Sequence, residues 1–397
     1  MRLLKYDVVI VGAGPSGSSA AKTAAELGVN VILLEEHPRA GIPNHCAEGL
    51  SLNGLKDAGL EPTEKIISQK ITKARVYAPN KRFLELTSSN WVGYTIKRDV
   101  FDQILSEKAC SAGADYFTNT KVIDVIKKNG TVAGVVALQG DEKIKIEAKV
   151  VIGADGFASV VRRSAGLGRW FLDVVSCAQY RLGNLKLDEP WVNEFYIGSN
   201  VAPGAYAWVF PKSSEEANVG LGVRRVHTDS AISYLKRFIS SDDRFKEAKI
   251  LSITGGITPV SGAIEKFVSN GLMLVGDAAG LLIPCTGAGV HTGVVSGNLA
   301  GKVAAESIED GDTSANRLAE YKDKFQETWG KRIQDSRKVV EMLDKFDDED
   351  LNLLAEVITS EDILALANGH DVARVVSRIV RRSPIKIMKL LAAYMRS

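Results

Sequence analysis

The amino-acid sequence predicts a mixed α/β fold: a discontinuous domain of parallel strands, an inserted antiparallel sheet and a helical C-terminal region. Three observations predict this fold class. A short β-branched strand runs directly into a glycine-rich turn near the N-terminus. Residues with alternating apolar side chains, typical of antiparallel strands, fill much of 60–94 and 165–260. From Ser314 onward the apolar spacing is helical.

The first unit begins with the β-branched run 8–11, which lacks alternation and is typical of a parallel strand covered on both faces. The turn GAGPSG follows directly at 12–17. An alanine-rich helix over 18–27 and a second strand over 29–34 come next, and that strand ends at Glu35. This order of strand, G-x-G-x-x-G turn, helix, strand and acid predicts a Rossmann-like dinucleotide site in which Glu35 accepts hydrogen bonds from ribose hydroxyls.

Each residue type in the turn has a physical reason. Gly12 permits the tight turn, Gly14 lets the backbone approach a pyrophosphate, and Gly17 lets the helix pack closely on the strand. Pro15 and Ser16 lie in the turn just before the helix, whose free N–H groups and positive dipole end attract phosphate. We therefore predict cofactor contacts along the whole turn.

Three later segments extend the prediction. A buried strand over 150–154 ends in Asp155, which either caps a turn or supports a ligand. Another buried strand over 271–275 runs into a GDAAG turn that carries Asp277. Arg98 opens a further helix and is a candidate cofactor contact or a surface cation. Because ligands bind outside the carboxyl ends of such strands, Asp277 is the strongest candidate of the three.

Together GAGPSG, ADGFASVVR and GDAAG resemble the para-hydroxybenzoate hydroxylase superfamily of FAD proteins, over residues 5 to about 310. The resemblance implies that FAD is the cofactor. It implies that the Asp277 carboxylate binds ribityl or ribose hydroxyls and that Arg98 lies near the pyrophosphate or the ribityl chain. It further implies backbone contacts to the flavin ring near Gly289 and Val290, and to adenine near Val122.

Two more segments narrow the family. PGAYAWVFP at 203–211 resembles the P-x-x-Y-x-W-x-F-P pattern of geranylgeranyl reductases, and HCAEG at 45–49 resembles the C-x-x-G segment of archaeal members. This resemblance implies FAD-dependent saturation of the prenyl chains of membrane ether lipids, with a prenylated glycerophospholipid as substrate. It also implies that Cys46, Ala47 and Gly49 lie beside the cofactor.

The aromatic residues Tyr206, Trp208 and Phe210 alternate, so they share one face of a strand. Such a stripe usually belongs to a core, but the bracketing prolines and the family pattern favour a wall for a prenyl tail. We therefore predict catalytic roles for Tyr206, Trp208 and Cys46. The Cys46 thiol either positions the alkene or donates a proton, and His45 is an alternative donor.

Composition excludes several classes. In 397 residues, 50 Lys and Arg against 48 Asp and Glu give a net charge of +2, which argues against a nucleic-acid binder. The four cysteines are scattered, so we expect neither a metal site nor disulfides, and free thiols fit a cytoplasmic location. No stretch of about 18 apolar residues exists, so no membrane span is expected.

The segment 374–396 interleaves basic and apolar residues, and Pro384 interrupts it. It is either a helical cap with a solvated basic face or a peripheral contact with the inner face of the cell membrane. No second G-x-G-x-x-G lies between a strand and a helix, so we expect an external reductant, ferredoxin-like or NAD(P)H. The predicted domains are an FAD-binding domain over 1–60, 95–165 and 260–310, a substrate domain over 61–94 and 166–259, and a helical region over 311–397.

Two other functions stay open at this point. A flavin monooxygenase that hydroxylates a small aromatic would share the cofactor motifs. A prenyl-lipid carrier without redox chemistry would share the general fold, but the intact GAGPSG, Glu35 and GDAAG elements argue against it. A quinone-linked electron-transfer flavoprotein is a weaker alternative, because no iron–sulfur set of cysteines is present.

Overall fold

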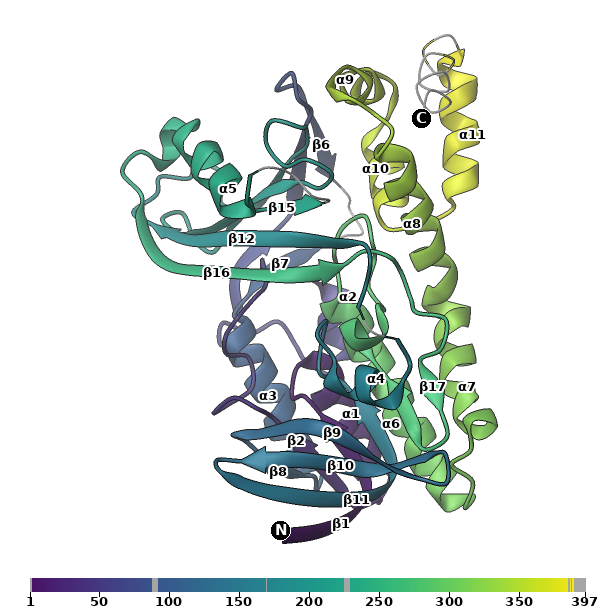
Figure 1. The fold of residues 1–397 in the computed structure, drawn as a ribbon. Helices are drawn as coiled ribbons and strands as arrows, with labels where there is room; N and C mark the ends of the chain where they lie inside the picture. The colour runs from purple at the N-terminus through teal and green to yellow at the C-terminus, as the bar shows by residue number, and fades with distance from the viewer. Residues whose placement is uncertain are drawn as a thin grey trace.

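The fold is described from a computed structural model. It consists of a lower sheet layered with helices, an upper sheet, and a column of helices along one side that spans both (Figure 1). The described residues are 2–87, 92–168, 170–224, 229–384, 386 and 388. The mixed α/β fold class is confirmed.

The lower sheet has eight strands, with the order β17-β18-β11-β1-β2-β8 and with β10 and β9 joined to β11. Strands β18, β11, β1, β2 and β8 run parallel, whereas β10 runs antiparallel to β11, and β9 runs antiparallel to β10. The expected first strand is the central one, and both of its neighbours lie parallel to it. The strands are β1 (Arg2–Val11), β2 (Val31–Leu34), β8 (Asp115–Phe117), β9 (Thr120–Lys128), β10 (Thr131–Gln139), β11 (Glu142–Gly153), β17 (Val268–Ser269) and β18 (Leu272–Leu274).

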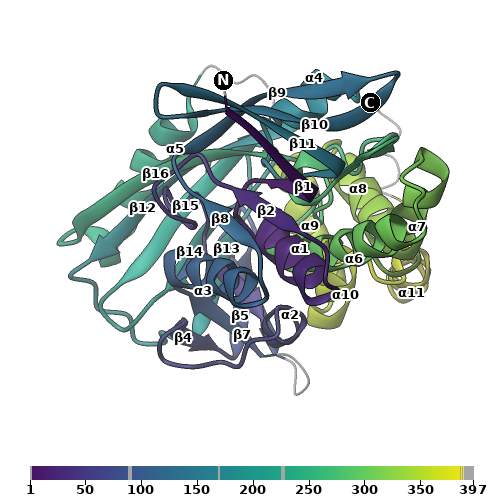
Figure 2. The same cartoon turned by 90° about the horizontal axis from the view of Figure 1, so that it is seen from below.

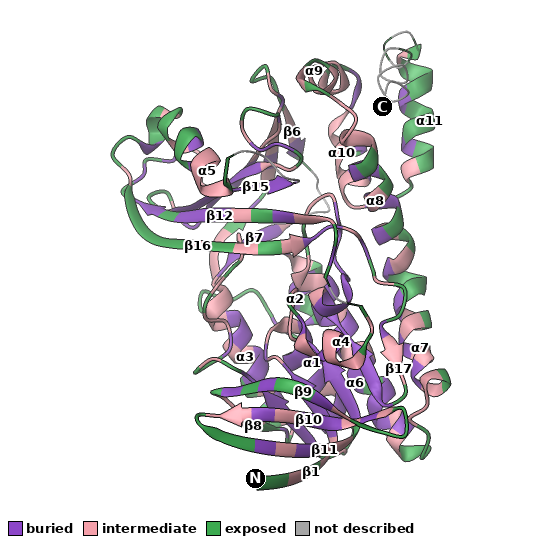
Figure 3. Ribbon diagram, viewed as in Figure 1, coloured by how far each residue is buried: buried purple, intermediate pink, exposed green. Residues whose placement is uncertain are grey.

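Helices α1 (Pro15–Glu26), α3 (Arg98–Ser111) and α6 (Val290–Glu309) pack beside this sheet, and α1 contacts both of the others. Small residues permit the close approach of α1 and α6. A Cβ on Gly297 would lie 2.1 Å from the Ser16 carbonyl oxygen, and one on Gly301 would lie 2.4 Å from that of Ala20. In Figure 3, the lower sheet and these helices form the most continuously buried part of the molecule.

The upper sheet has seven strands in the order β16-β12-β15-β14-β13-β5-β6. Its four central strands are those expected from the alternating segments, each displaced by a residue or two, and neighbouring pairs run antiparallel. Helix α5 (Ala231–Ser240), which the sequence analysis did not predict, covers one face. The strands are β5 (Lys73–Tyr77), β6 (Phe83–Thr87), β12 (Val174–Gly183), β13 (Val192–Tyr196), β14 (Ala207–Pro211), β15 (Ala217–Arg224) and β16 (Lys249–Pro259).

A third sheet has three strands in the order β3-β7-β4. Along the chain, β3 follows β2 of the lower sheet, and β7 directly precedes α3. Figure 2 shows α1, α2 and α3 gathered near β7. The remaining elements are β3 (Gly49–Ser51), β4 (Ile67–Ile71), β7 (Gly93–Ile96), α2 (Leu52–Asp57), α4 (Val160–Ala165), and the short helices η1 (Asp243–Phe245) and η2 (Gly276–Ala279).

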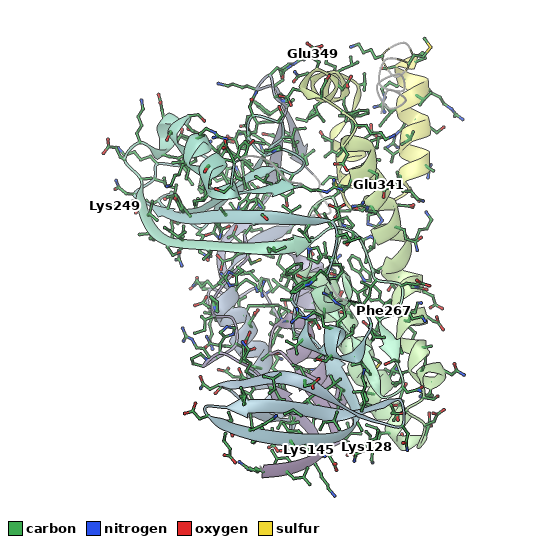
Figure 4. All side chains as sticks on the ribbon, in the orientation of Figure 1. Lys128, Lys145, Lys249, Phe267, Glu341 and Glu349 are labelled. Atoms are coloured by element: carbon green, nitrogen blue, oxygen red, sulfur yellow. The ribbon has the colours of Figure 1, made fainter. Side chains whose placement is uncertain are left out.

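The C-terminal helices form the column on the right of Figure 1. Near its base the buried Phe267, labelled in Figure 4, packs edge-on against Tyr321 at 5.7 Å between ring centroids. Higher up, Arg337 donates to the Val260 carbonyl at 3.0 Å and pairs with Asp173. The elements are α7 (Ala315–Phe325), the π-helical turn η3 (Gln326–Gly330), α8 (Lys331–Leu343), α9 (Asp348–Val357), α10 (Ser360–Ala367) and α11 (Val372–Arg382).

Two arginines of the basic segment form ion pairs within the column of C-terminal helices. Asp362 is fully buried in α10, and Arg378 and Arg382 of α11 both pair with it. Helix α11 ends at Arg382, before Pro384, as expected. Residues 385, 387 and 389–396 of the predicted segment lie outside the described residues. Across the described part of the chain, no helix has the length and apolar character needed to cross a bilayer.

Candidate active site

The glycine turn between β1 and α1 is closed on one side and open on the other. Gly12 has φ +98°, and a Cβ there would lie 2.5 Å from the Ala154 carbonyl oxygen. A Cβ on Gly17 would lie 1.8 Å from the Gly12 carbonyl oxygen, so only glycine fits. A Cβ on Gly14 would meet nothing within 4 Å. Pro15 and Ser16 form the first turn of α1 behind it. This opening fits a pyrophosphate at the helix N-terminus.

Glu35 directly follows β2, and its carboxylate is turned back toward the glycine turn. Its Oε2 accepts the Ala13 N–H at 2.9 Å, and its Oε1 accepts the His37 N–H at 2.9 Å. Thr120 N–H donates to the Glu35 carbonyl oxygen at 2.8 Å, so Val122 lies two residues along β9 from this junction. The predicted ribose and adenine contacts therefore lie at the same end of the sheet.

Asp277 lies in η2, opposite the start of α6. A Cβ on Gly289, the N-cap residue of α6, would lie 3.0 Å from Asp277 Oδ1, and Val290 is the first residue of that helix. Burial raises the pKa of Asp277, and the Arg98 cation opposes that rise. Among the described residues, none donates a hydrogen bond to this carboxylate. A half-buried acceptor beside a helix N-terminus fits the ribityl hydroxyls that the family resemblance assigns to it.

Asp155 and Arg162 support the turn that carries Asp277. The Asp155 Oδ2 accepts the Val161 N–H at 3.0 Å, which is the turn-capping contact that the sequence analysis kept as one alternative. The buried Arg162 guanidinium donates to the Ala278 carbonyl at 3.0 Å and stacks over Phe171 at 4.2 Å. The ADGFASVVR segment thereby holds the GDAAG turn in place.

The Arg98 side chain is bound by protein groups. Its guanidinium makes a bidentate contact to Asp102, one helical turn along α3, at 2.9 and 2.8 Å. Burial lowers the pKa of Arg98, but the Asp102 carboxylate and the Cys46 sulfur raise it more, and the net shift is upward. The guanidinium is therefore held by Asp102, stays protonated, and interacts electrostatically with Cys46 and Asp277.

A chain of hydrogen bonds links the Cys46 segment to the upper sheet. The Trp208 indole Nε1–H donates to Gln179 Oε1 at 2.8 Å. The Gln179 Nε2–H in turn donates to the Cys46 carbonyl at 3.1 Å. Cys46 Sγ accepts the Glu48 N–H at 3.2 Å. Two of the predicted catalytic residues, distant in the sequence, are thus joined through Gln179, which the sequence analysis missed.

The aromatic residues share one face of β14, as predicted, although Tyr206 precedes the strand. The rings of Tyr206 and Trp208 meet edge-on at 5.9 Å, and Phe195 of β13 contacts both Tyr206 and Phe210. We call these four side chains the aromatic row. Trp208 and Phe210 are buried, whereas Tyr206 is partly exposed, so the accessible end of the row is at Tyr206.

Two contacts fix the ends of the aromatic row. Tyr206 Oη donates to the Thr286 carbonyl, in the segment that leads to Gly289, and burial raises the pKa of this phenol. At the other end, a Cβ on Gly49 would lie 2.9 Å from the Phe210 ring. The predicted cofactor residue Gly49 therefore lies against the aromatic row, and glycine is needed there for close packing.

Glu48 is a second residue that the sequence analysis missed. It is 4% exposed and has φ +75°. Its carboxylate accepts from Asn44 Nδ2 at 2.8 Å, from the Arg98 N–H at 3.0 Å and from Asn218 Nδ2 at 2.8 Å, and it pairs with buried Lys212. Ala47, predicted as a cofactor contact, offers its carbonyl to Asn218 at 3.2 Å.

The other candidates lie elsewhere. His45 is exposed, and His291 Nε2 pairs with Asp57 at 2.6 Å. Among the described residues, no group of three His, Cys, Asp or Glu side chains could hold a metal ion. The structure thus links Cys46 to the aromatic row through Gln179, places Gly289 beside Asp277, and places Glu35 beside the glycine turn.

The comparisons with known proteins agree with this geometry. The family model described as an FAD binding domain matches residues 5–335. The chain is 38% identical to digeranylgeranylglycerophospholipid reductase 2 of Methanopyrus kandleri, over 96% of this chain and 97% of the other. It is 39% identical to the digeranylgeranylglycerophospholipid reductase of Methanothrix thermoacetophila, over 98% and 99%.

The chain belongs to the digeranylgeranylglycerophospholipid reductase family. Among solved structures, the geranylgeranyl bacteriochlorophyll reductase-like protein of Thermoplasma acidophilum superimposes with a TM-score of 0.89, at 34% identity over 98% of this chain and 100% of the other. A flavin-dependent brominase at 21% identity and a TM-score of 0.71 shares the fold alone, over 92% of this chain and 94% of the other. As in other reductases of this family, FAD is the cofactor. The resemblance to geranylgeranyl reductases that the sequence showed is confirmed.

Proposed function

We propose that this protein is an FAD-dependent reductase that saturates the double bonds of geranylgeranyl chains in ether phospholipids. The observation that carries the proposal is the hydrogen-bond chain Trp208–Gln179–Cys46. It joins the aromatic row to the segment beside Arg98 and Asp277, so an apolar wall and a cofactor cradle meet at one place. The family to which the chain belongs supplies the substrate class.

The chemistry asks three things of the protein. When bound, reduced FAD would supply a hydride, which carries both of the electrons that the reduction of one double bond needs. An isolated trisubstituted alkene is not electrophilic, so a proton must reach it with or before the hydride, and the reaction adds two hydrogens to each double bond. The protein must therefore supply a proton source, exclude water and align the prenyl chain of the lipid with the hydride donor.

The residues of the site suit these tasks. The faces of Tyr206 and Trp208 stabilise positive charge that develops on the alkene through their quadrupoles. The Trp208 and Tyr206 polar hydrogens are both donated to protein acceptors, Gln179 and Thr286. We therefore assign the proton to the Cys46 thiol or to a water beside it. We assign the cofactor to the residues predicted for it: Gly12, Gly14, Pro15, Ser16, Gly17, Glu35, Cys46, Ala47, Gly49, Arg98, Val122, Asp277, Gly289 and Val290.

Three broader assignments belong to the same proposal. The reductant is external, ferredoxin-like or NAD(P)H. The protein works in the cytoplasm and touches the inner face of the membrane through the exposed side of α11, where Val376 and Val380 are 40% and 36% exposed beside exposed Arg374 and Arg381. The FAD-binding domain comprises 1–60, 95–165 and 260–310, the substrate domain 61–94 and 166–259, and the helical region 311–397.

The test is a single turnover without oxygen. FAD-loaded protein is reduced with dithionite and mixed with a digeranylgeranyl glycerophospholipid, while the oxidised flavin band and the lipid mass are followed. We expect the band to return as the lipid gains two hydrogens per flavin. Reduced flavin that persists until oxygen is admitted would refute the proposal. Hydroxylation of an added aromatic would then indicate a monooxygenase, and a protein that binds lipid but no flavin would be a carrier.

A further inference from the structure

Two residues after Cys46, a buried ion pair joins two parts of the chain that are far apart in sequence. Glu48 and Lys212 have side chains that are each 5% exposed, and 164 residues separate them. Lys212 directly follows β14, the strand that carries the aromatic row, and its Nζ also donates to the Ile96 carbonyl at 3.2 Å. We call Glu48, Lys212 and Asn218 the Glu48 cluster.

The Glu48 cluster fixes the backbone on both sides of Cys46. Glu48 itself adopts φ +75°, a left-handed conformation that costs a non-glycine residue free energy unless its surroundings hold it. Its N–H then points at Cys46 Sγ, 3.2 Å away. Asn218 holds the Ala47 carbonyl at 3.2 Å, and Asn44 binds the Glu48 carboxylate from the preceding turn.

The same carboxylate also fixes the start of the helix that carries Arg98. Glu48 Oε1 accepts the Arg98 backbone N–H at 3.0 Å, at the first residue of α3. Glu48 thus contacts Cys46 Sγ through its own backbone N–H and fixes the backbone of Arg98 through its carboxylate. An ion pair so deeply buried contributes little net stability compared with apolar residues, so a role in positioning explains it better than a role in stability.

We propose that Glu48 and Lys212 are positioning residues, which hold the Cys46 thiol in its reactive orientation between Arg98 and the aromatic row. The proposal rests on the proposed function only for its substrate. The described hydrogen bonds of the two side chains go to Asn44, Arg98, Asn218, the Ile96 carbonyl and each other, and none goes to Tyr206 or Trp208. Their effect on the reaction passes through the backbone of 46–48.

The test uses FAD-loaded protein and three variants: Glu48→Gln, Lys212→Met, and the two combined. Lys73→Met is the matched control, because Lys73 pairs with Glu85 on the same sheet, with side chains 35% and 30% exposed, away from Cys46. The first readout is the rate of Cys46 alkylation by iodoacetamide, followed on its own peptide by mass analysis. The second is the rate of lipid-dependent flavin reoxidation at increasing lipid concentration.

We expect Glu48→Gln and Lys212→Met each to change the Cys46 alkylation rate at least about 5-fold and to lower the maximal reoxidation rate at least about 10-fold. The lipid concentration for half-maximal rate and the FAD content stay within about 2-fold. The combined variant, which leaves no unpaired buried charge, recovers part of the rate. Lys73→Met behaves as the unsubstituted protein.

Unchanged Cys46 alkylation in both single variants, with FAD retained, would overturn the proposal. If these variants instead lose FAD or unfold, the combined variant decides: full Cys46 reactivity and full reoxidation rate in it would also overturn the proposal. Because alkylation needs no lipid, this readout judges the positioning even if the unsubstituted protein fails to reduce the lipid. That failure would count against the proposed function alone.

Discussion

The cofactor end and the aromatic end of this protein are built by opposite means. At the cofactor end, side chains are removed: Gly12 and Gly17 let backbone pack on backbone, and Gly14 leaves open space. At the aromatic end, large and charged side chains from distant segments meet around Cys46. The difference teaches that the first region is specified locally, whereas the second depends on how two sheets are placed together.

Gly17→Ala should have the largest effect. Its new Cβ would lie 1.8 Å from the Gly12 carbonyl oxygen, so the turn must distort. We expect the purified variant to lack FAD, with an affinity reduced more than 100-fold, and to unfold at a lower temperature. Flavin absorbance per protein and thermal unfolding measure both. A variant with full FAD content would show that the turn is not closed as described.

Gly14→Ala sharpens the same point, because its Cβ meets no protein atom within 4 Å. We expect the apoprotein to unfold at the temperature of the unsubstituted apoprotein. FAD affinity should nevertheless fall about 10-fold, since the methyl group enters the space that a pyrophosphate needs. Titration of apoprotein with FAD checks this. Equal loss of stability in the Gly14 and Gly17 variants would contradict the distinction between open and closed sides.

Tyr206→Phe probes the aromatic end. The variant keeps the ring contacts to Trp208 and Phe195 but loses the hydrogen bond to the Thr286 carbonyl. Losing one hydrogen bond of this kind costs about 1 kcal/mol, so we expect a rate of lipid-dependent reoxidation reduced about 5-fold with FAD retained. Stopped-flow absorbance measures it. A loss of more than about 100-fold would instead make the phenol the proton source.

Asp362→Asn addresses an ion cluster remote from both ends. Burial alone would raise the pKa of Asp362, but hydrogen bonds from Thr359 and Arg378 outweigh it and lower the pKa to about 2. A carboxylate with a lowered pKa in the folded state stabilises it above pH 4, and this stabilisation is lost as the pH falls toward 2. We expect the variant to lose about 2 kcal/mol at neutral pH, with no change in reoxidation rate.

The control for this prediction is Asp350→Asn. Asp350 occupies the same capping-box position in α9, and no arginine among the described residues pairs with it. Thermal unfolding of both variants between pH 2.5 and 7 compares them. The Asp362 variant should lose the larger part of its deficit below pH 4. A deficit that stays constant over this range would contradict the assigned pKa.

The regions differ in how far the sequence predicts them, for the same physical reason. The contact of Gly17 with Gly12 and the ion pair of Arg98 with Asp102 each lie within six residues, so they follow local spacing: the G-x-G-x-x-G pattern for the first and the i, i+4 interval for the second. The pairing of Glu48 with Lys212 spans 164 residues, and no local pattern marks it. Trp208 was predicted from a family pattern, whereas its partner Gln179 is known only once β12 and β14 are placed in one sheet.

The C-terminal segment shows the same limit. Its basic and apolar spacing predicted an amphipathic helix, and α11 is one. The spacing did not reveal that Arg378 and Arg382 bind a buried carboxylate from the preceding helix. Only the remaining exposed residues of α11 are therefore available to contact a membrane surface. The division of the chain into three domains stays a prediction.

The most direct test of the account is a comparison of Trp208→Phe with the unsubstituted protein, both reduced without oxygen and then mixed with a digeranylgeranyl glycerophospholipid. Phenylalanine keeps an aromatic ring but breaks the hydrogen bond to Gln179, and with it the link to Cys46. We predict full FAD content, unchanged reoxidation by oxygen, and reoxidation by the lipid slowed at least about 10-fold. Loss of FAD in step with turnover, or an unchanged rate with the lipid, would contradict the claim that the aromatic end positions the substrate while the glycine end holds the cofactor.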